Sequence, residues 1–449
     1  MNASAASSEN KPLLERALSV FADVRPGEAA TALLLALNVF LLLGAYYIIK
    51  PVREALILTG GGAEIKSYSG AVQAALFMFI VPAYSAFASR VNRIRLINVI
   101  FIIFISNLII FYLLSKTGIP LGIPFFLWIG LFNVMLTAQF WSFANDVYTP
   151  EQGKRLFAIV GFGSTIGAVS GSKAAEFLVK SVGVYSMMVV SAGVLCISMV
   201  LYNLIHQREK ASKTTEIDPK VAEAPLGGKG GFQLVMAHRY LLLIGILTLM
   251  VNWVNTTGEY ILGKSVSQMA KDVIASGTAG GLSEGQIIGG FYANFQFWQN
   301  VLGAVIQLFL VSRILKYIGI RWAIFILPLI SLSSYSLLAL APILAYIRIA
   351  KIAENSTDYS LQNTVRHSLF LPTSRDAKYK AKQAVDTFFW RFGDMMSAVT
   401  VFVGAQLMHL AVRNFAIFNA SLVILWIVIA AAIGRRYQTL ASEQPAKAA

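Results

Sequence analysis

Residues 43–59 read Leu-Gly-Ala-Tyr-Tyr-Ile-Ile-Lys-Pro-Val-Arg-Glu-Ala-Leu-Ile-Leu-Thr, and this stretch decides the fold class. It continues a long apolar run, yet it carries Lys50, Arg53 and Glu54 where the middle of a membrane span would lie. A charge at the centre of a transmembrane helix costs about 2.5–3.5 kcal/mol on insertion scales, so it requires a partner or a water-filled cavity. The stretch therefore predicts a transmembrane helix beside a polar cavity. Alternatively, Pro51 could kink the helix and let the charged groups reach the lipid headgroups.

The composition of the whole chain supports a membrane protein. Hydrophobic residues make up 57% of the 449 residues and charged residues only 13%, with a mean hydropathy of +0.66. These values exclude an ordinary soluble globular protein. The net charge of +15 comes from basic residues that lie between apolar runs and form no aromatic-interleaved patch, so we expect no nucleic-acid partner.

Twelve apolar runs are long enough to cross the hydrocarbon core as helices, which takes about 17–25 residues each. The runs are continuous and do not alternate with polar residues, which excludes a closed β-barrel. We therefore predict an all-α polytopic membrane protein with twelve transmembrane helices in two six-helix repeats. The predicted spans are residues 29–58, 67–89, 95–115, 123–147, 155–179, 184–206, 239–263, 287–313, 319–340, 342–367, 383–410 and 414–434.

The connections between these spans predict the domain boundaries and the orientation. Lys and Arg follow the even-numbered spans, whereas the odd-numbered connections are poor in both, so we expect both termini on the cytoplasmic side of a cell (inner) membrane. The N-terminus shows no removable signal peptide. The predicted parts are a cytoplasmic segment 1–28, a six-helix bundle 29–206, a cytoplasmic linker 207–238, a second six-helix bundle 239–434 and a tail 435–449.

Charged residues concentrate in spans one, seven and ten and at the end of span four. In a transporter built from two parallel six-helix repeats, the substrate site lies near the midplane between the repeats, and the first and fourth helices of each repeat line it. Cations in such a cavity make strong hydrogen bonds to phosphate, and Arg can bind two oxygens at once. The predicted substrate-binding residues are Lys50, Arg53, Glu54, Asn145, Asp146, Glu259, Lys264, Arg348, Lys351 and Asp358.

Several of these charges also have structural explanations. Glu259 could pair with Lys264 as a strut between helices, and we hold this equal to a role in binding. The acidic residues, among them Glu354, would hold the cations while the cavity is empty. In span eleven an ion network that controls closure is as good an explanation as ligand contact. That network would comprise Asp386, Arg391 and Asp394.

Other motifs predict no chemistry. The stretch 161–171, Gly-Phe-Gly-Ser-Thr-Ile-Gly-Ala-Val-Ser-Gly, lacks the Gly-Lys-Ser/Thr ending of a phosphate loop, and small residues four apart indicate close helix packing. The four histidines are scattered, and Cys196 is the only cysteine. We therefore predict no metal site, no cofactor and no enzymatic activity.

Three segments resemble a known family. The run Tyr46-Tyr-Ile-Ile-Lys-Pro-Val-Arg-Glu-Ala-Leu-Ile-Leu-Thr59 is similar to the first helix of the non-mitochondrial ATP/ADP translocases of plastids and intracellular bacteria. Residues 140–149, with Gly153-Lys-Arg-Leu-Phe157 after them, resemble the fourth-to-fifth helix segment of that family. Asp358-Tyr-Ser-Leu361 and residues 380–386 resemble its tenth-to-eleventh helix segment.

The resemblance implies a major-facilitator-type carrier that exchanges nucleotides or related phosphorylated anions by alternating access. Carried over by position, Arg53 matches a functional lysine of helix one, Glu259 an acidic residue of helix seven, and Lys382 a lysine before helix eleven. The resemblance therefore adds Lys382 to the predicted substrate-binding residues. The chain departs from the family at Ile129, where helix four of the family carries an acidic residue. It also has Arg366 and His367 where the family has lysine and glutamate, which puts strict ATP-for-ADP exchange in question.

Three other functions stay open. The chain could carry another organic anion, coupled to protons through Glu259 or Asp358. It could be a membrane-embedded transferase, although the spans show no nucleophile or acid–base pair beside a metal or donor site. It could be a divergent member of the fold that transports nothing, but charges this costly inside the spans argue against that possibility.

Overall fold

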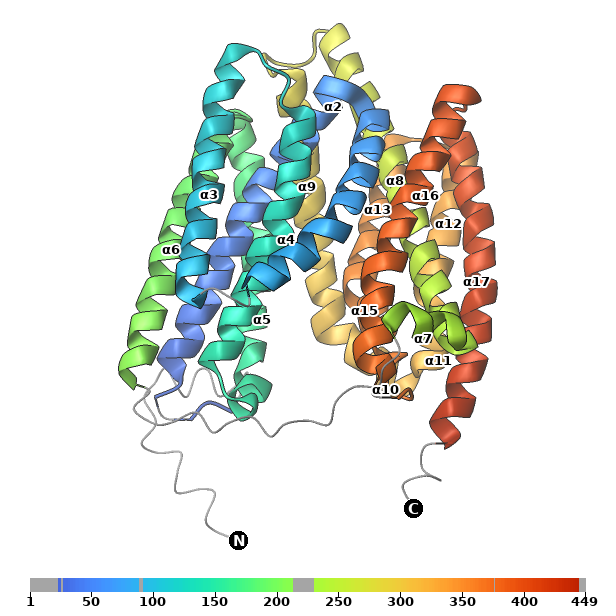
Figure 1. Ribbon diagram of the computed structural model, residues 1–449. Coiled ribbons are helices and arrows are strands. Elements are labelled where there is room, and N and C mark those ends of the chain that lie inside the picture. Colours follow the sequence, from blue (N-terminus) through green and yellow to red (C-terminus); the bar gives the residue numbers. More distant parts are fainter. Residues whose placement is uncertain (1–22, 26, 89–91, 213–229, 375, 444–449) are drawn as a thin grey trace.

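The computed structural model describes residues 23–25, 27–88, 92–212, 230–374 and 376–443, and this part of the chain is helical and contains no strand (Figure 1). Most of the predicted segment 1–28, the centre of the predicted linker and the end of the tail lie outside the described residues. We call the end of the bundle where α2 begins and α17 ends the terminal end. The opposite end, where α2 bends, is the far end (Figure 1).

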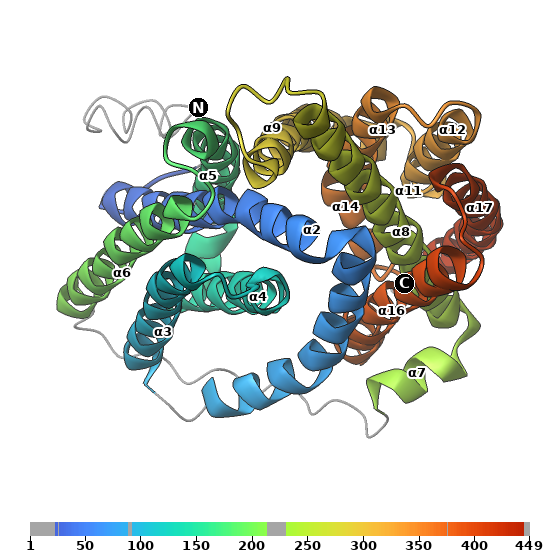
Figure 2. The ribbon, with the colours of Figure 1, turned by 90° about the horizontal axis from the view of Figure 1, so that it is seen from above.

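Helix α2 (Ala29–Ala88) contains the stretch quoted first and contributes two predicted spans. It bends at Gly62, whose φ of 74° lies in the left-handed region that favours glycine. Figure 2 shows that α2 turns back around the first half of the molecule after this bend. The bend therefore places residues beyond it beside residues of the first leg.

The first half continues with four further helices. They are α3 (Arg93–Leu114), α4 (Gly122–Val147), α5 (Pro150–Ser181) and α6 (Ser186–Ser212). Helix α5 begins at a capping box between Thr149 and Gln152. An added Cβ at Gly163, Gly167 or Gly171 would lie 2.4–2.6 Å from a backbone oxygen of α2. The glycine-rich stretch is therefore a packing face, as predicted, because only glycine allows two backbones to approach so closely.

The second half begins with α7 (Gly231–Ala237) and α8 (Arg239–Ala275). Four of its later helices are segmented by short helical or π-helical stretches. The elements are α9 (Glu284–Val305), η2 (Ile306–Leu310), α10 (Val311–Tyr317), α11 (Ile320–Ala323), α12 (Ile326–Leu340), α13 (Leu344–Thr357), η3 (Asp358–Gln362), α14 (Asn363–Ser368), η4 (Ala377–Ala381), α15 (Lys382–Ala384), η5 (Val385–Phe389), α16 (Trp390–Val401), η6 (Phe402–Leu407) and α17 (Val412–Glu443).

Nine helices of the described residues are long and apolar enough to cross a membrane. Helix α2 counts once among them although it covers two predicted spans, and the predicted spans 342–367 and 383–410 are more polar and segmented. The all-α membrane class is confirmed, whereas the number of twelve crossings stays a prediction.

The two halves contact each other at the far end and along the pair α5 and α9. At the far end, Glu64 Oε1 accepts hydrogen bonds from Lys264 Nζ at 2.5 Å and from Tyr260 Oη at 3.0 Å. Between α5 and α9, Asn300 Nδ2 donates to Ser172 Oγ at 3.0 Å. These contacts join the halves on both sides of a central polar cavity.

Candidate functional site

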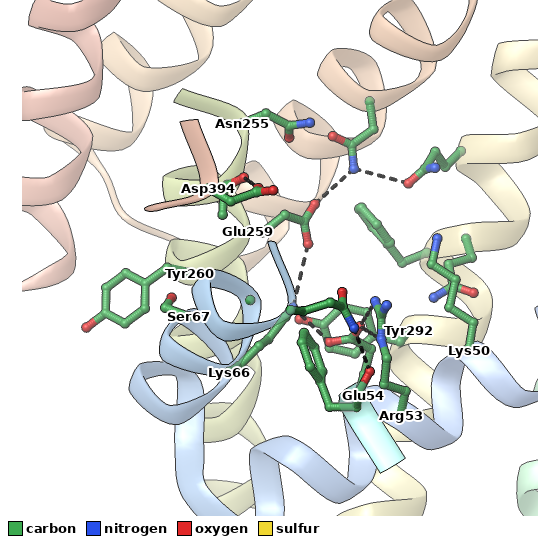
Figure 3. Close-up of a pocket in the computed structure, with 18 of the residues that line it drawn as sticks. Lys50, Arg53, Glu54, Lys66, Ser67, Asn255, Glu259, Tyr260, Tyr292 and Asp394 are labelled. Atoms are coloured by element: carbon green, nitrogen blue, oxygen red, sulfur yellow. Dashed lines mark hydrogen bonds and ion pairs between the residues drawn. The ribbon is translucent and has the colours of Figure 1, made fainter. Parts of the chain in front are cut away.

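A cavity of about 250 Å³ lies between the two halves, and Figure 3 shows the side chains around it. Helix α2 contributes residues from both of its legs, and α8, α9, α13, η3 and α16 contribute residues from the second half. The charged residues that line it are Lys50, Arg53, Glu54, Lys66, Glu259, Arg391 and Asp394.

The α2 cluster, which we define as Lys50, Arg53, Glu54 and Lys66, forms the first side of the cavity. Arg53 Nε donates to Glu54 Oε1 at 2.9 Å, and the Arg53 Nη2 atom contacts the same oxygen. Lys66 Nζ lies 2.7 Å from Glu54 Oε2. Glu54 is only 2% exposed, so its carboxylate is buried between two cations. The bend at Gly62 makes this arrangement, because it brings Lys66 back to the first leg of α2.

Lys50 differs from the other cations of the α2 cluster. Its ammonium group makes no ion pair with a carboxylate of any described residue, and lies 5.2 Å and 5.9 Å from the ring centroids of Tyr47 and Tyr46. Aromatic faces stabilise a cation weakly compared with a carboxylate at hydrogen-bond distance. Lys50 is therefore the cation most available to an anion in the cavity.

Glu259 on α8 connects the two halves. Its Oε2 atom lies 3.8 Å from Lys66 Nζ, and its Oε1 atom lies 3.7 Å from Lys351 Nζ. Asn355 Nδ2 donates to Oε1 at 3.0 Å. The alternative in which Glu259 pairs with Lys264 does not match this geometry, because Lys264 binds Glu64.

The α13 cluster, which we define as Lys351, Glu354, Ser331 and Tyr335, lies behind Glu259 and does not line the cavity. Lys351 is 1% exposed, and its ammonium lies 2.9 Å from Glu354 Oε2 and 2.6 Å from the Asn255 Oδ1 that accepts from it. Ser331 Oγ and Tyr335 Oη donate to the Glu354 carboxylate at 3.0 Å each. This lysine and this glutamate satisfy each other inside the second half.

Asp394 and Arg391 contribute a third charged pair to the cavity wall. Asp394 Oδ1 accepts from Asn252 Nδ2 at 2.8 Å and from Thr256 Oγ1 at 3.0 Å. Its other oxygen lies 3.5 Å from Arg391 Nη1. The Arg391 guanidinium also lies over the ring of Phe77, on the second leg of α2. The pair therefore joins α8, α16 and α2, as an ion network would.

Seven predicted binding residues lie outside the cavity, and two of them have been described above: Lys264, which binds Glu64, and Lys351 of the α13 cluster. Asp146 is 53% exposed and pairs with Arg93 at 3.2 Å, beside Asn145 at the end of α4. Arg348 Nη2 contacts Asn294, and Lys382 lies 4.0 Å from Asp386. Asp358 is buried next to the cavity, in η3. Ile129 occupies the position where the family carries an acidic residue. Its side chain packs in the apolar core and offers no polar group to a ligand or a partner.

The sequence interpretation missed Lys66 and the uncharged polar residues of the cavity. The predicted spans leave Lys66 in the connection before the second span, although the run Gly60-Gly-Gly62 marks a bend just before it. Amides on α8, α9 and α13 could have been recognised as polar groups inside apolar spans. They are Asn255, Gln296, Gln299 and Asn355. Within the described parts of the chain, no three His, Cys, Asp or Glu residues are grouped as a metal site would require.

Comparison with protein families gives three related matches. The family model described as TLC ATP/ADP transporter matches residues 125–273. ADP,ATP carrier protein 1 of Chlamydia pneumoniae is 24% identical over 305 residues, which are 58% of this chain and 56% of the relative. ADP,ATP carrier protein 1 of Chlamydia trachomatis serovar D is 22% identical over 353 residues, which are 68% and 63% of the two chains. The chain therefore spans less than two thirds of the length of these relatives.

Comparison with solved structures identifies the fold. The POT family transporter PepTSo matches with a TM-score of 0.62 at 12% identity, over 91% of this chain and 98% of that chain. The nucleoside transporter NupG matches with a TM-score of 0.61 at 13% identity, over 89% and 98%. At this level of identity the likeness shows the fold alone, which is of the major-facilitator type, as predicted.

Proposed function

We propose that this chain, a relative of the TLC ATP/ADP transporters, is a secondary transporter that exchanges nucleotides or closely related phosphorylated anions across a membrane. The observation that carries the proposal is the excess of cations in the α2 cluster: Arg53 and Lys66 pair with the single carboxylate of Glu54, and Lys50 is a third cation on the same cavity wall. Such an excess in a poorly solvated cavity favours an anion with several oxygens.

The exchange would follow from how the empty cavity balances its charges. Glu54 binds Arg53 and Lys66, and the 3.8 Å contact between Lys66 and Glu259 extends this balance to the second half. A phosphate that enters would compete with these carboxylates for the cations. Closing the empty cavity would leave Lys50 buried without a counter-ion, which is costly, so the loaded carrier would change state more readily than the empty one.

The far-end bonds of Glu64 to Lys264 and Tyr260 would break when the cavity opens on that side. The bundles 29–206 and 239–434 would be the two moving parts, with the linker 207–238 and both termini in the cytoplasm. The chain would act as a carrier and catalyse no covalent chemistry.

Proteoliposomes that are loaded with ADP and take up labelled ATP test this function. We expect the wild-type protein to show uptake that depends on internal ADP, and Arg53→Gln to lower it at least about 10-fold, since a hydrogen bond to a charged group contributes about 1.5–3 kcal/mol. Lys116→Gln is the matched control, because it removes an exposed cation that lies over Tyr112, outside the cavity.

Two results would contradict the proposal. Uptake by Arg53→Gln at the wild-type rate would remove the α2 cluster from the substrate site. Wild-type protein that transports a different organic anion but no nucleotide would replace the substrate and leave the cavity assignment in place.

A further inference from the structure

A second cavity of about 390 Å³ adjoins the one described above. The two cavities share four lining residues, which are Tyr46, Lys50, Gln299 and Tyr359. The other residues of the second cavity come from α2, α4, the middle of α5, later turns of α9, η2 and η3. Because α9 starts at the far end, these later turns place the second cavity nearer to the terminal end (Figure 1).

The chemistry of the second cavity differs from that of the first. Apart from the shared Lys50, no charged residue lines it among the described residues. Its walls carry amides and hydroxyls, and three of these side chains make no hydrogen bond to any described residue: Asn133, Thr137 and Gln307. Asn133 and Thr137 are four residues apart on α4, so they lie on one face of the helix. We call this the neutral cavity and the first one the cationic cavity.

Tyr359 lies where the two cavities meet. Its side chain is 58% exposed, although the neighbouring residues Asp358 and Ser360 are buried in η3. An aromatic ring with a free face inside a membrane protein offers a stacking surface to a planar ligand group. Nucleobases stack favourably on the faces of aromatic side chains.

We propose that the neutral cavity binds the nucleoside part of the substrate, with the base against Tyr359, while the phosphates occupy the cationic cavity. Lys50 lines both cavities and would contact the phosphate next to the sugar. This assignment rests on the proposed function and specifies it: the substrate class is a nucleoside polyphosphate, bound with its base toward the terminal end.

The dimensions agree with a ligand that spans both cavities. Ligand pockets commonly have volumes of about 300–1,000 Å³. The cationic cavity alone, at about 250 Å³, falls below this range, and the adjoining neutral cavity, at about 390 Å³, adds the room that a ligand larger than its phosphate groups requires. Pyrophosphate would fill only the cationic part, so it separates the contributions of the two cavities.

The test measures binding of ADP and of pyrophosphate to the purified full-length protein in detergent by calorimetry. We expect Tyr359→Ala to weaken ADP binding roughly 10-fold and to change pyrophosphate binding less than about twofold, since only ADP carries a base to stack. Tyr359→Phe, which keeps the ring, should recover most of the loss. Asn133→Ala provides a second variant on another helix, with the same selective effect expected, in case Tyr359→Ala folds poorly. Arg53→Gln should weaken both ligands.

The outcomes separate this inference from the function on which it rests. If Tyr359→Ala and Asn133→Ala each weaken ADP and pyrophosphate equally, or neither ligand, the neutral cavity does not bind the nucleoside and the inference is wrong, while nucleotide exchange stands. If wild-type protein binds pyrophosphate as tightly as ADP, the inference also fails. If it binds no nucleotide at all, the proposed function fails together with the inference.

Discussion

The α2 cluster and the α13 cluster both combine basic side chains with a glutamate, but their charges are balanced differently. The α2 cluster has three cations and one carboxylate, which pairs with Arg53 and Lys66 but not with Lys50, and all four side chains line the cavity. In the α13 cluster Lys351 binds Glu354 at 2.9 Å and lies farther, 3.7 Å, from Glu259, while a serine and a tyrosine complete the Glu354 carboxylate's hydrogen bonds away from the cavity. The first cluster has charge left over for a ligand, whereas the second has none.

A charged residue inside a membrane span is therefore not a binding residue unless part of its charge is left unpaired. Removing a partner from a balanced buried pair leaves an unpaired charge and destabilises the fold. Removing a cation that has no partner mainly takes away a ligand contact. The two clusters should therefore respond differently to neutralisation, and the following predictions test this difference.

The largest effect is expected for Lys351→Met in the α13 cluster. It leaves Glu354 buried without its cation, which costs about 3–5 kcal/mol. Thermal unfolding in detergent should show a large fall in the melting temperature. The double variant Lys351→Met, Glu354→Leu should recover most of the lost stability, and a double variant as unstable as the single one would show that the pair is not self-contained.

The next effect is expected for Gly258→Ala. A Cβ at this position would lie 2.1 Å from Tyr335 Oη and 3.0 Å from Lys351 Nζ, so it would displace the hydroxyl that binds Glu354. Overpacking of this kind costs about 1–3 kcal/mol. Gly289→Ala is the matched control, because its Cβ would lie 3.4 Å from a methyl group of Val179, which is ordinary contact. Equal melting temperatures for the two variants would contradict the tight packing described here.

A smaller effect in binding, with no loss of stability, is expected for Lys50→Gln in the α2 cluster. Since Lys50 has no carboxylate partner among the described residues, its removal strands no charge. ADP affinity should fall about 10-fold, as for one charge-assisted hydrogen bond, while the melting temperature stays unchanged. Lys50→Arg should keep most of the affinity. A lowered melting temperature without loss of affinity would show that Lys50 stabilises the fold and does not bind the ligand.

Glu64→Gln should have a still smaller effect at the far end. Lys264 is about half exposed, and such a pair contributes about 0.2–1 kcal/mol. The substitution should therefore shift the balance of states toward opening at the far end without unfolding the protein. The readout is thiol labelling of a cysteine placed at Ser67, which lines the cavity, in a Cys196→Ser background that has no other cysteine. Unchanged labelling would show that this bond does not hold the cavity closed.

The smallest effect is expected for Glu28, which forms an ion pair at the water boundary beside the terminal end. Burial raises the pKa of the Glu28 carboxyl, but hydrogen bonds from Arg155, the Arg25 N–H and Gln152 outweigh this and lower the pKa below its usual 4.5. Its contribution to stability is therefore present above pH 4.5 and is lost as the pH falls through the lowered value. Glu28→Gln should cost under about 1 kcal/mol at pH 7, and should flatten the acid side of the stability profile.

The sequence predicted the parts of the molecule that depend on local chemistry. Apolar runs of membrane length specify the spans, because each unsatisfied backbone group in lipid is costly. The small residues at 163, 167 and 171 specify a packing face, which α5 and α2 form. The charges at Lys50, Arg53 and Glu54 specify a polar cavity, which those residues do line.

The sequence could not predict which charges would meet. Lys351 and Glu354 lie on the same helix as Asn355, which lines the cavity, yet they bind each other behind it. The predicted substrate site does not include Lys66, although the Lys66 ammonium lies 2.7 Å from the Glu54 carboxylate. Both differences arise because the balance of a buried charge depends on every element packed around it, and sequence spacing reports only the neighbours on one helix.

The sequence alone specifies a helical membrane protein with two cations and one carboxylate near the middle of its first span, because hydrophobic transfer and the cost of burying charge are local properties. Only the tertiary structure decided that the bend at Gly62 brings Lys66 to Glu54, that Glu259 connects the halves, and that Lys50 keeps no carboxylate partner. Those outcomes depend on where separate helices pack, since an ion pair forms only where the fold brings its two members together.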